Sequence, residues 1–377
     1  MAASETPAAK RRPSLPFQVR IEPRITEAPR WLSPLVSFGA IVVALILGGV
    51  VLALVGGSPF RAYAHIARAS FGSVGVFSDT LVKATPLMLT GLACTVAFRM
   101  RLWNIGAEGQ LFMGAFAASA VVLTPLVPAE TPQLLILLAM AVAGFIAGAL
   151  WGSVPGILKA KLNVNEVLTT LMMNYIAFSW VNFFVYAVWS EGGFQMSRMF
   201  PKSAWMPRLA DYADQIPAFR GLTTHLGLVL GIVAAVVLWW VLDRSKWGFE
   251  IKLTGDNPKA ARYSGIHIVR NTVLVMMLSG GLAGLAGMSE ISGVVHRLQG
   301  AFSPGYGFTG IIVAWLAKLN PLAVVPVSIL FGALLLAGRE IQPSGIPRLI
   351  QGIILFCLIS SDFLLRYRIR IVRQGQV

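Results

Sequence analysis

The sequence predicts an all-α polytopic membrane protein with about ten transmembrane helices in two inverted five-helix repeats. Hydrophobic residues make up 56% of the 377-residue chain, and charged residues only 12%. Uncharged stretches of roughly membrane-spanning length recur along it, and their starting positions repeat at an offset of about 190 residues. These three observations carry the fold prediction.

The composition excludes an ordinary soluble fold, because soluble domains carry about 25% charged residues. The chain has 31 Lys and Arg against 16 Asp and Glu, a net charge of +15. In a soluble protein this excess would suggest nucleic-acid binding. Here about two thirds of the basic residues fall on one side of the predicted spans, as the positive-inside rule requires. We therefore expect a lipid bilayer, and no nucleic acid, as the partner.

A bilayer core of about 30 Å needs about 20 helical residues. The first run after the basic N-terminal stretch, 35–57, is too long for a signal peptide and lacks a cleavage motif, so we expect a retained anchor. Lys83, Asp362 and the Pro/Gly-rich start of the eighth run weaken three of the spans. The ten candidate spans are 35–57, 80–98, 109–128, 133–158, 167–190, 225–242, 271–290, 304–318, 320–338 and 349–365.

Ten spans place both termini on one side, and the basic residues put that side in the cytoplasm. Residues 1–34 are expected to be a largely disordered basic cytoplasmic tail, because prolines recur there with little apolar content. Residues 35–365 form the transmembrane domain, and 366–377 form a second basic cytoplasmic tail. Within the domain, 243–270 is a cytoplasmic loop and 191–224 a periplasmic loop.

The two halves are predicted to be inverted relative to each other. Spans one and six, two and seven, four and nine, and five and ten are separated by similar offsets of about 190 residues. Five spans per half is an odd number, so the second half enters the membrane upside down. Transport proteins use such repeats, with the pathway between the halves.

Residue patterns for catalysis are missing. The chain contains no Gly-Lys dipeptide and therefore no phosphate-binding loop of the Gly-x-x-x-x-Gly-Lys type. The four histidines are far apart in sequence, and the two cysteines lie in apolar stretches. We expect no enzyme activity, no metal site, no cofactor and no disulfide in this chain.

The cytoplasmic loop contains a short, separately capped helix. Asn257 suits an N-cap, Pro258 the first helical position, and Gly265 a left-handed end. Ala260 and Ala261 give this helix a surface that another protein can approach closely. The pattern fits a docking element, and it equally fits a surface loop that turns the chain.

The stretch Gly255–Ile266 resembles the coupling-helix motif of ABC importer permeases of the ribose, branched-chain amino acid and nucleoside type. Lys259-Ala260-Ala261 followed by Gly265 is similar to their Glu-Ala-Ala-x-x-x-Gly loop, with Lys in place of Glu. The resemblance implies contact with an ABC ATPase. The residues implied in it are Gly255, Asn257, Pro258, Lys259, Ala260, Ala261, Tyr263 and Gly265.

Two further blocks resemble the nucleoside branch of that family, which works with binding proteins of the BMP family. Residues 104–110 read Asn-Ile-Gly-Ala-Glu-Gly-Gln, and 165–175 also match. The likeness covers about residues 35–365 and implies a nucleoside permease subunit of the bacterial inner membrane. It further implies a second, different permease subunit, an extracytoplasmic solute-binding protein, and ATP with Mg on the partner ATPase.

Polar and aromatic residues in or near the spans are the candidates for a translocation pathway, because polar groups at membrane depth usually face the bundle interior or water. Glu108 equally fits a carboxylate that binds backbone N–H groups at a helix break. Glu166 fits a capping pair with Asn163, and the aromatic residues fit the membrane interface. The candidates are Asn104, Glu108, Gln110, Asn165, Glu166, Asn174, Glu290, Phe302, Tyr306 and Phe308.

Three other functions remain open from the sequence. A sugar or amino-acid importer subunit would share the same motifs. A secondary transporter driven by an ion gradient would also use inverted repeats. A scaffold without transport would move no solute in any complex.

Overall fold

A computed structural model of the chain describes residues 17–23, 32–124, 127–128, 130–338 and 346–373. They divide into two compact units, which are described separately. One comprises Met1–Val50 with Gly352–Val377, and the other comprises Val51–Gln351.

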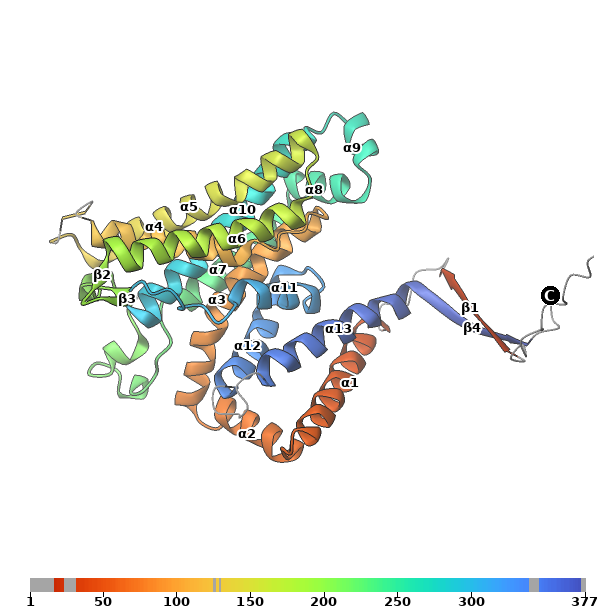
Figure 1. Cartoon of the computed structure of the whole chain (residues 1–377), viewed down its shortest axis with the longest axis horizontal. Coiled ribbons are helices and arrows are strands. Elements are labelled where there is room, and N and C mark those ends of the chain that lie inside the picture. Colours follow the sequence, from red (N-terminus) through yellow and green to blue (C-terminus); the bar gives the residue numbers. More distant parts are fainter. Residues whose placement is uncertain (1–16, 24–31, 125–126, 129, 339–345, 374–377) are drawn as a thin grey trace, which may run out of the picture. The chain divides into compact units, whose positions relative to one another are not determined.

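The described residues are mostly helical, and a helix lies in each of the ten predicted segments (Figure 1). In the first half these are α1 (Leu32–Leu54), α3 (Val74–Arg99), α4 (Ala107–Leu123), α5 (Gln133–Leu162) and α6 (Glu166–Phe183). In the second half they are α7 (Gly227–Arg244), α10 (Ile268–Glu290), α11 (Tyr306–Leu316), α12 (Pro321–Ala337) and α13 (Ile346–Arg366). The π-helical segments η1 (Phe184–Val188) and η5 (Ile291–Val295) extend α6 and α10.

Five of these helices are long and apolar enough to cross a membrane: α3, α5, α6 with η1, α7, and α10 with η5. A sixth candidate combines Phe38–Leu54 with Pro59–Phe71. Four others are shorter apolar helices, and α11, with 11 residues, is only about 16 Å long. Such a helix cannot cross a 30 Å core alone. The five long apolar helices confirm a polytopic membrane fold. The count of ten crossings stays a prediction.

Several elements were not predicted. Helix α2 (Pro59–Phe71) lies between the first two predicted spans. The segment expected as a periplasmic loop contains the strands β2 (Ser190–Glu191) and β3 (Phe194–Ser197). It also holds three 3₁₀ turns, η2 (Lys202–Ala204), η3 (Leu209–Tyr212) and η4 (Pro217–Phe219).

The two expected tails also contain structure. Strand β1 (Phe17–Pro23) pairs antiparallel with β4 (Tyr367–Arg373), with Phe17 opposite Arg373 and Pro23 opposite Tyr367. A strand in these seven residues was not expected, and the second tail supplies its hydrogen-bonding partner. The rest of that tail, 1–16 and 24–31, lies outside the described residues.

Helices α3 and α10 form the core of the larger unit. α3 is buried along almost its whole length, and α10 over most of its own. α10 packs against α4 and α5, while α3 packs against α11 and α12, and the two also touch each other. Each central helix therefore packs against two helices of the other predicted half.

Glycines allow the close approach of α5 and α10. A Cβ atom on Gly148 would lie 2.2 Å from the carbonyl oxygen of Gly280, and one on Gly284 would lie 2.2 Å from that of Gly144. Small residues at this crossing therefore bring the two helix backbones into contact.

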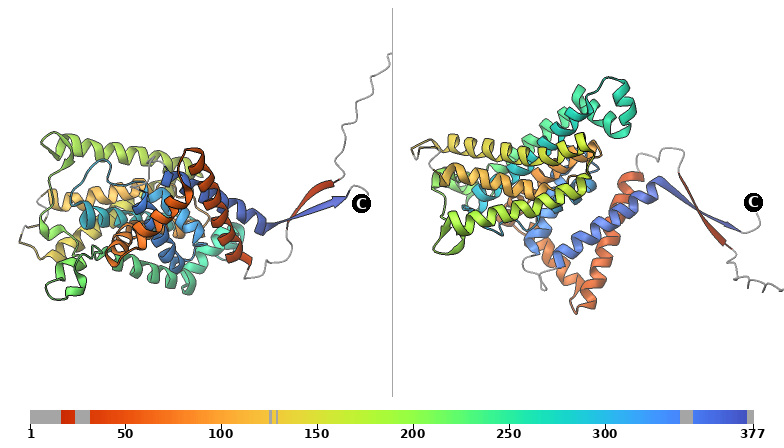
Figure 2. Two further views of the ribbon diagram at one scale, coloured as in Figure 1. Left: turned by 90° about the horizontal axis from the view of Figure 1, so that it is seen from below. Right: turned by 45° about the horizontal axis from the view of Figure 1, so that its top comes forward.

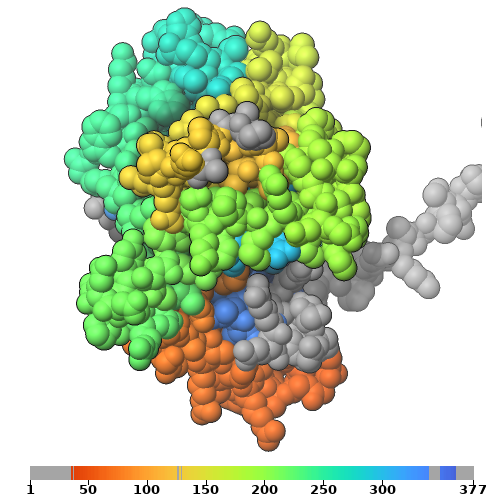
Figure 3. All heavy atoms as spheres, turned by 90° about the vertical axis from the view of Figure 1, so that its left-hand side faces the viewer, coloured from red at the N-terminus to blue at the C-terminus, as the bar shows by residue number. Residues whose placement is uncertain are grey.

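The two ends of the larger unit differ. Helices α8 (Lys246–Asp256) and α9 (Pro258–Tyr263) lie at one end of α5 and α10, and the β2–β3 hairpin lies at the other (Figures 1 and 2). Figure 3 looks onto the hairpin end, where the segment between α6 and α7, in green, covers much of the face.

Candidate functional site

The N-termini of α4 and α11 meet inside the larger unit. A Cβ atom on Gly307 would lie 2.2 Å from the backbone nitrogen of Glu108, so the two backbone segments touch there. The buried Glu108 carboxylate accepts a hydrogen bond from the Gly307 N–H. A carboxylate at a helix N-terminus satisfies free N–H groups and the positive end of the helix dipole. Glu108 therefore joins the broken segments of the two predicted halves.

Asn104 and Gln110 stabilise the break that precedes α4. The Asn104 Nδ2 donates to Gln110 Oε1 and to Ser279 Oγ, each at 2.8 Å. The Asn104 Oδ1 accepts from the Gly106 N–H at 3.0 Å. Both amide side chains are almost completely buried, so their hydrogen bonds hold this irregular backbone against α10.

Asn174 holds the same break from the side of α6. Its Oδ1 accepts from the Gly109 N–H at 2.8 Å, and its Nδ2 donates to the Ile105 carbonyl at 3.0 Å. The structure thus brings Asn104, Glu108, Gln110 and Asn174 together around one backbone break. These contacts are structural, and a role in solute passage stays a prediction for all four residues.

The start of α6 differs from the prediction. Asn163 has φ 51° and ends α5, whereas Asn165 is the N-cap of α6 and accepts from the Val167 N–H at 2.9 Å. The expected capping pair of Asn163 with Glu166 is wrong, because the two residues belong to different helices. Glu166 instead pairs with Lys159 at 3.0 Å.

A buried ion pair connects the two central helices. Lys83 of α3 donates to Glu290 Oε1 at the end of α10, at 3.1 Å, and to the Tyr306 hydroxyl, also at 3.1 Å. The Tyr306 hydroxyl donates to the same Glu290 oxygen at 3.2 Å. Lys83, which weakened the second predicted span, is thus neutralised by a partner 207 residues away.

The other two candidate aromatic residues lie apart from this pair. The Phe302 ring packs on Phe112 at a centroid distance of 4.5 Å and is buried, whereas Phe308 is 40% exposed. Tyr306 is completely buried. Stacking of a solute on these rings stays a prediction.

Two histidines that no sequence motif singles out lie beside the ion pair. His225 is buried, and its ring lies against Gly293, where a Cβ atom would be 2.7 Å from the ring. Its Nδ1 accepts from the Gly227 N–H at 3.1 Å. His225 precedes α7, and burial, with the Arg208 and Lys83 cations nearby, lowers its pKa from 6.5 to about 4. The imidazole is therefore neutral at pH 7.

His296 follows η5 and lies between two residues of the hairpin-end segment. Its ring stacks on Trp205 at 3.9 Å, and its Nε2 accepts from Arg208 at 2.8 Å. Burial and the Arg208 cation lower the pKa of His296 to about 4. In the sequence, the feature that could have indicated these two histidines is their position next to the ends of predicted spans. Only the fold brings them together.

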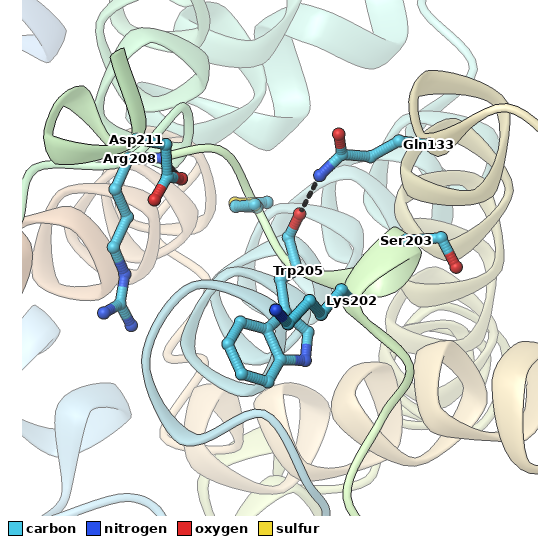
Figure 4. A pocket seen from close by; sticks show the side chains of 7 residues that line it. Gln133, Lys202, Ser203, Trp205, Arg208 and Asp211 are labelled. Atoms are coloured by element: carbon cyan, nitrogen blue, oxygen red, sulfur yellow. Dashed lines mark hydrogen bonds between the residues drawn. The ribbon is translucent and has the colours of Figure 1, made fainter. Parts of the chain in front are cut away.

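A cavity of about 510 Å³ opens beside this cluster (Figure 4). Arg208 and Asp211 line one part of it, and Gln133 donates to the Trp205 carbonyl at 2.8 Å in another. Trp205 and Arg208, which line this cavity, are also the residues that contact His296.

The predicted coupling helix lies at the opposite end. Asn257 accepts from the Ala260 N–H at 3.1 Å, Pro258 is the first residue of α9, and Gly265 has φ 76°. The predicted caps are thus confirmed. Ala261 is buried, whereas Tyr263 is 94% exposed and projects from the helix. A large aromatic side chain without cover is typical of a contact surface.

Helix α8 connects α9 to the turn between α3 and α4. A Cβ atom on Gly255 would lie 2.9 Å from the Arg99 carbonyl oxygen, so this end of α8 rests directly on the turn. Arg101 Nη2 donates to Asp256 Oδ1 at 2.9 Å. Beside this contact lies a groove of about 580 Å³ lined in part by Phe249, Lys252 and Leu319.

Within the part of the chain that the structure describes, no three His, Cys, Asp or Glu side chains are grouped so that they could hold a metal ion. Cys94 and Cys357 are free and buried.

Residues 76–359 match the family described as branched-chain amino acid transport system, permease component. The chain is 33% identical over 366 residues to a glucose ABC transporter permease protein of Haloferax volcanii, and the similarity covers 94% of each chain. It is 34% identical over 339 residues to a guanosine ABC transporter permease protein of Bacillus subtilis, covering 88% of this chain and 94% of that one. A nucleoside ABC transporter permease protein of Lactococcus lactis is 32% identical over 326 residues, covering 83% and 86%.

Proposed function

We propose that this chain, which belongs to the branched-chain amino acid transport system permease family, is the permease subunit of an ATP-driven nucleoside importer. As an ABC transporter permease it is not an enzyme itself. The finer assignment to nucleosides is supported by the block 104–110 and by the relatives named for guanosine and nucleosides.

The observation that carries the proposal is the construction of α9. This helix has its own N-cap and its own left-handed end, and it presents Tyr263 almost fully exposed. We infer that a cleft of a partner ATPase holds it, with ATP and Mg bound by that partner. The residues proposed for this contact are Gly255, Asn257, Pro258, Lys259, Ala260, Ala261, Tyr263 and Gly265.

The solute would pass by alternating access between two inverted halves. The reciprocal packing of α10 on α4 and α5, and of α3 on α11 and α12, supports such a repeat. The contact of Glu108 with Gly307 supports a gate between the halves, because the N-termini of two of the shorter apolar helices, one from each predicted half, meet there. Movement of either helix would open this contact.

The proposed assembly contains a second, different permease subunit and an extracytoplasmic solute-binding protein. The ten predicted spans and the basic residues support a multi-pass protein of the bacterial inner membrane with both termini in the cytoplasm. The α8–α9 end would then face the cytoplasm, and the β2–β3 end the periplasm.

The test is uptake by the purified complex in proteoliposomes. With ATP inside and the binding protein outside, radiolabelled guanosine should accumulate, and a non-hydrolysable ATP analogue should prevent it. Uptake by this chain alone under a proton or sodium gradient would refute the proposal in favour of an ion-coupled transporter.

A sugar importer is the second candidate function, because the glucose permease relative is similar over 94% of each chain. Glucose in place of guanosine in the same assay separates the two. Accumulation of glucose without guanosine would assign the chain to sugars.

A further inference from the structure

The groove of about 580 Å³ beside α8 carries an excess of positive charge. Its volume lies within the range of ligand pockets, which is about 300–1,000 Å³. Among the described residues, four cations and two carboxylates line it: Arg99, Arg101, Lys252, Lys318, Asp243 and Asp256. The net charge of +2 on one wall of this size attracts an anionic group.

Both carboxylates already serve to hold the walls of the groove together. Arg99 donates to Asp243 at the end of α7, and its Nε donates to the Leu319 carbonyl at 2.9 Å. Arg101 donates to Asp256 at the end of α8 at 2.9 Å. Two arginines thus join α3, α7, α8 and the turn between α11 and α12. The groove is therefore formed before a ligand arrives, and its carboxylates are already paired.

Helix α7 indicates the depth of the groove in a bilayer. Its exposed apolar side chains recur every three or four residues and form one face suited to lipid: Val229, Val233, Val236, Val237 and Trp240. Trp240 ends this face, and tryptophan is enriched where the hydrocarbon core meets the headgroups. Asp243 follows three residues later, about 4.5 Å along the axis. The polar layer on each side of a bilayer is about 5–8 Å thick, so the groove lies at headgroup level.

Aromatic side chains from other helices indicate the same depth. Phe98, which lines the groove, packs against Trp103 and Trp315 at centroid distances of 5.3 and 6.0 Å. Trp103 is 43% exposed, and Arg244 lies over the Trp239 ring at 5.6 Å. Tryptophans gathered at one end of a helical bundle, next to basic residues, are typical of a membrane interface.

The groove combines cationic side chains with apolar ones. Phe98 and Leu242 are buried in its lining, and Phe249 is an exposed aromatic residue there. An inorganic anion would use only the cations. A phospholipid uses both kinds of side chain, since its phosphate binds cations and its glycerol and upper acyl chains contact apolar groups. An acidic protein segment has the same charge, but the position at headgroup level favours a lipid.

We propose that this groove binds the headgroup of an anionic phospholipid, with Lys252 and Lys318 holding the phosphate. The proposal goes beyond the proposed function, since it does not depend on which solute the protein moves. Phosphatidylglycerol carries one negative charge and meets the excess positive charge of the groove. Phosphatidylcholine has no net charge and gains little there.

The experiment measures which lipids stay bound to the full chain. The protein is placed in nanodiscs of equal parts phosphatidylglycerol and phosphatidylcholine, extracted in mild detergent, and analysed by native mass spectrometry. The wild type should retain phosphatidylglycerol over phosphatidylcholine by about tenfold or more, and Lys252→Gln with Lys318→Gln should lose this preference. Lys161→Gln with Lys246→Gln is the matched control, because these exposed lysines lie at the same end but outside the groove.

The control should keep the wild-type preference. An equal preference in the wild type and the groove variant would overturn the proposal. An equal loss in the control would also overturn it, because the charge of the whole end would then be responsible. Lys318 has φ 50°, so if Lys318→Gln does not fold, Lys252→Gln alone decides by the same ratio.

Two other results would assign the groove to a different occupant. A wild type without any lipid preference would overturn the proposal and favour an acidic segment of a partner protein. Loss of the preference on addition of millimolar inorganic phosphate would overturn it in favour of free phosphate.

Discussion

Arg101 donates to Asp256 across the junction between the α3–α4 turn and the last residue of α8. Arg101 has φ 58°, and its N–H and that of Leu102 bond back to Phe98 and Ala97, which is the pattern of a helix end that normally uses glycine. The pair is well exposed, so we expect it to contribute less than about 1 kcal/mol to stability. Its importance would lie in linking α9 to the break that holds Glu108.

Reversing either charge of this pair should uncouple transport. Arg101→Asp or Asp256→Arg places like charges in contact, and we expect uptake per ATP hydrolysed to fall about fivefold with little change in melting temperature. The double reversal should restore coupling. Equal coupling ratios in all four proteins, measured in proteoliposomes, would contradict the link.

Removal of one partner from the buried ion pair should destabilise the protein. Lys83→Met leaves Glu290 without its cation, and we expect a loss of about 3–5 kcal/mol. The double variant Lys83→Met with Glu290→Leu should recover much of it. Lys159→Met is the matched control, because that pair is more exposed and should cost less than about 1 kcal/mol.

Denaturation in detergent measures these losses. Equal losses for Lys83→Met and Lys159→Met would show that the buried pair is not a core contact.

The glycine contact between α5 and α10 should not tolerate a methyl group. Gly148→Ala would place a Cβ atom 2.2 Å from the Gly280 carbonyl oxygen, so we expect a loss of about 2–3 kcal/mol or more. A Cβ atom on Gly39 would meet no atom within 4 Å, so Gly39→Ala should be neutral or stabilising by up to about 1 kcal/mol. Melting temperatures in one detergent compare the two, and similar values would refute the close packing.

Stability should decrease in acid because of His225. Its pKa is lowered from 6.5 to about 4, so the folded state binds this proton less readily than the unfolded state. The contribution of the neutral His225 ring to the free energy of unfolding is complete above pH 6.5 and is lost as the pH falls from 6.5 to 4. Below pH 4 this group changes the free energy of unfolding no further. We expect its loss to be on the order of 2–3 kcal/mol.

Unfolding midpoints of the wild type and His225→Gln between pH 7.5 and 4.5 measure this effect. A difference between the two proteins that does not change with pH would contradict a buried neutral histidine.

Local patterns predicted much of the fold, because helix caps and apolar runs depend on neighbouring residues. The caps of α9 at Asn257 and Gly265 are examples. Helix α2 was missed because its 13 residues mix polar and apolar side chains and match no span. The pairing of β1 with β4 could not be predicted from local sequence patterns, since the two strands lie at opposite ends of the chain.

Contacts across the fold explain what the sequence could not predict of the site. Glu108 was identified, but its partner Gly307 is 199 residues away. In the sequence, Lys83 only weakened the prediction of the second span. Its ion pair could not be predicted, because it requires α3 and α10 to lie side by side. His225 and His296 carried no motif, and only the fold brings both next to η5.

The most direct test of the account is ATP-driven guanosine uptake by the reconstituted complex with Tyr263→Asp. This side chain is 94% exposed, so its replacement should leave the fold unchanged, and we expect uptake to fall about tenfold or more as ATPase contact is lost. Tyr212→Asp, at an exposed tyrosine of the hairpin end, should keep wild-type uptake. Full ATP-dependent uptake with Tyr263→Asp would contradict the transmission of force through α9.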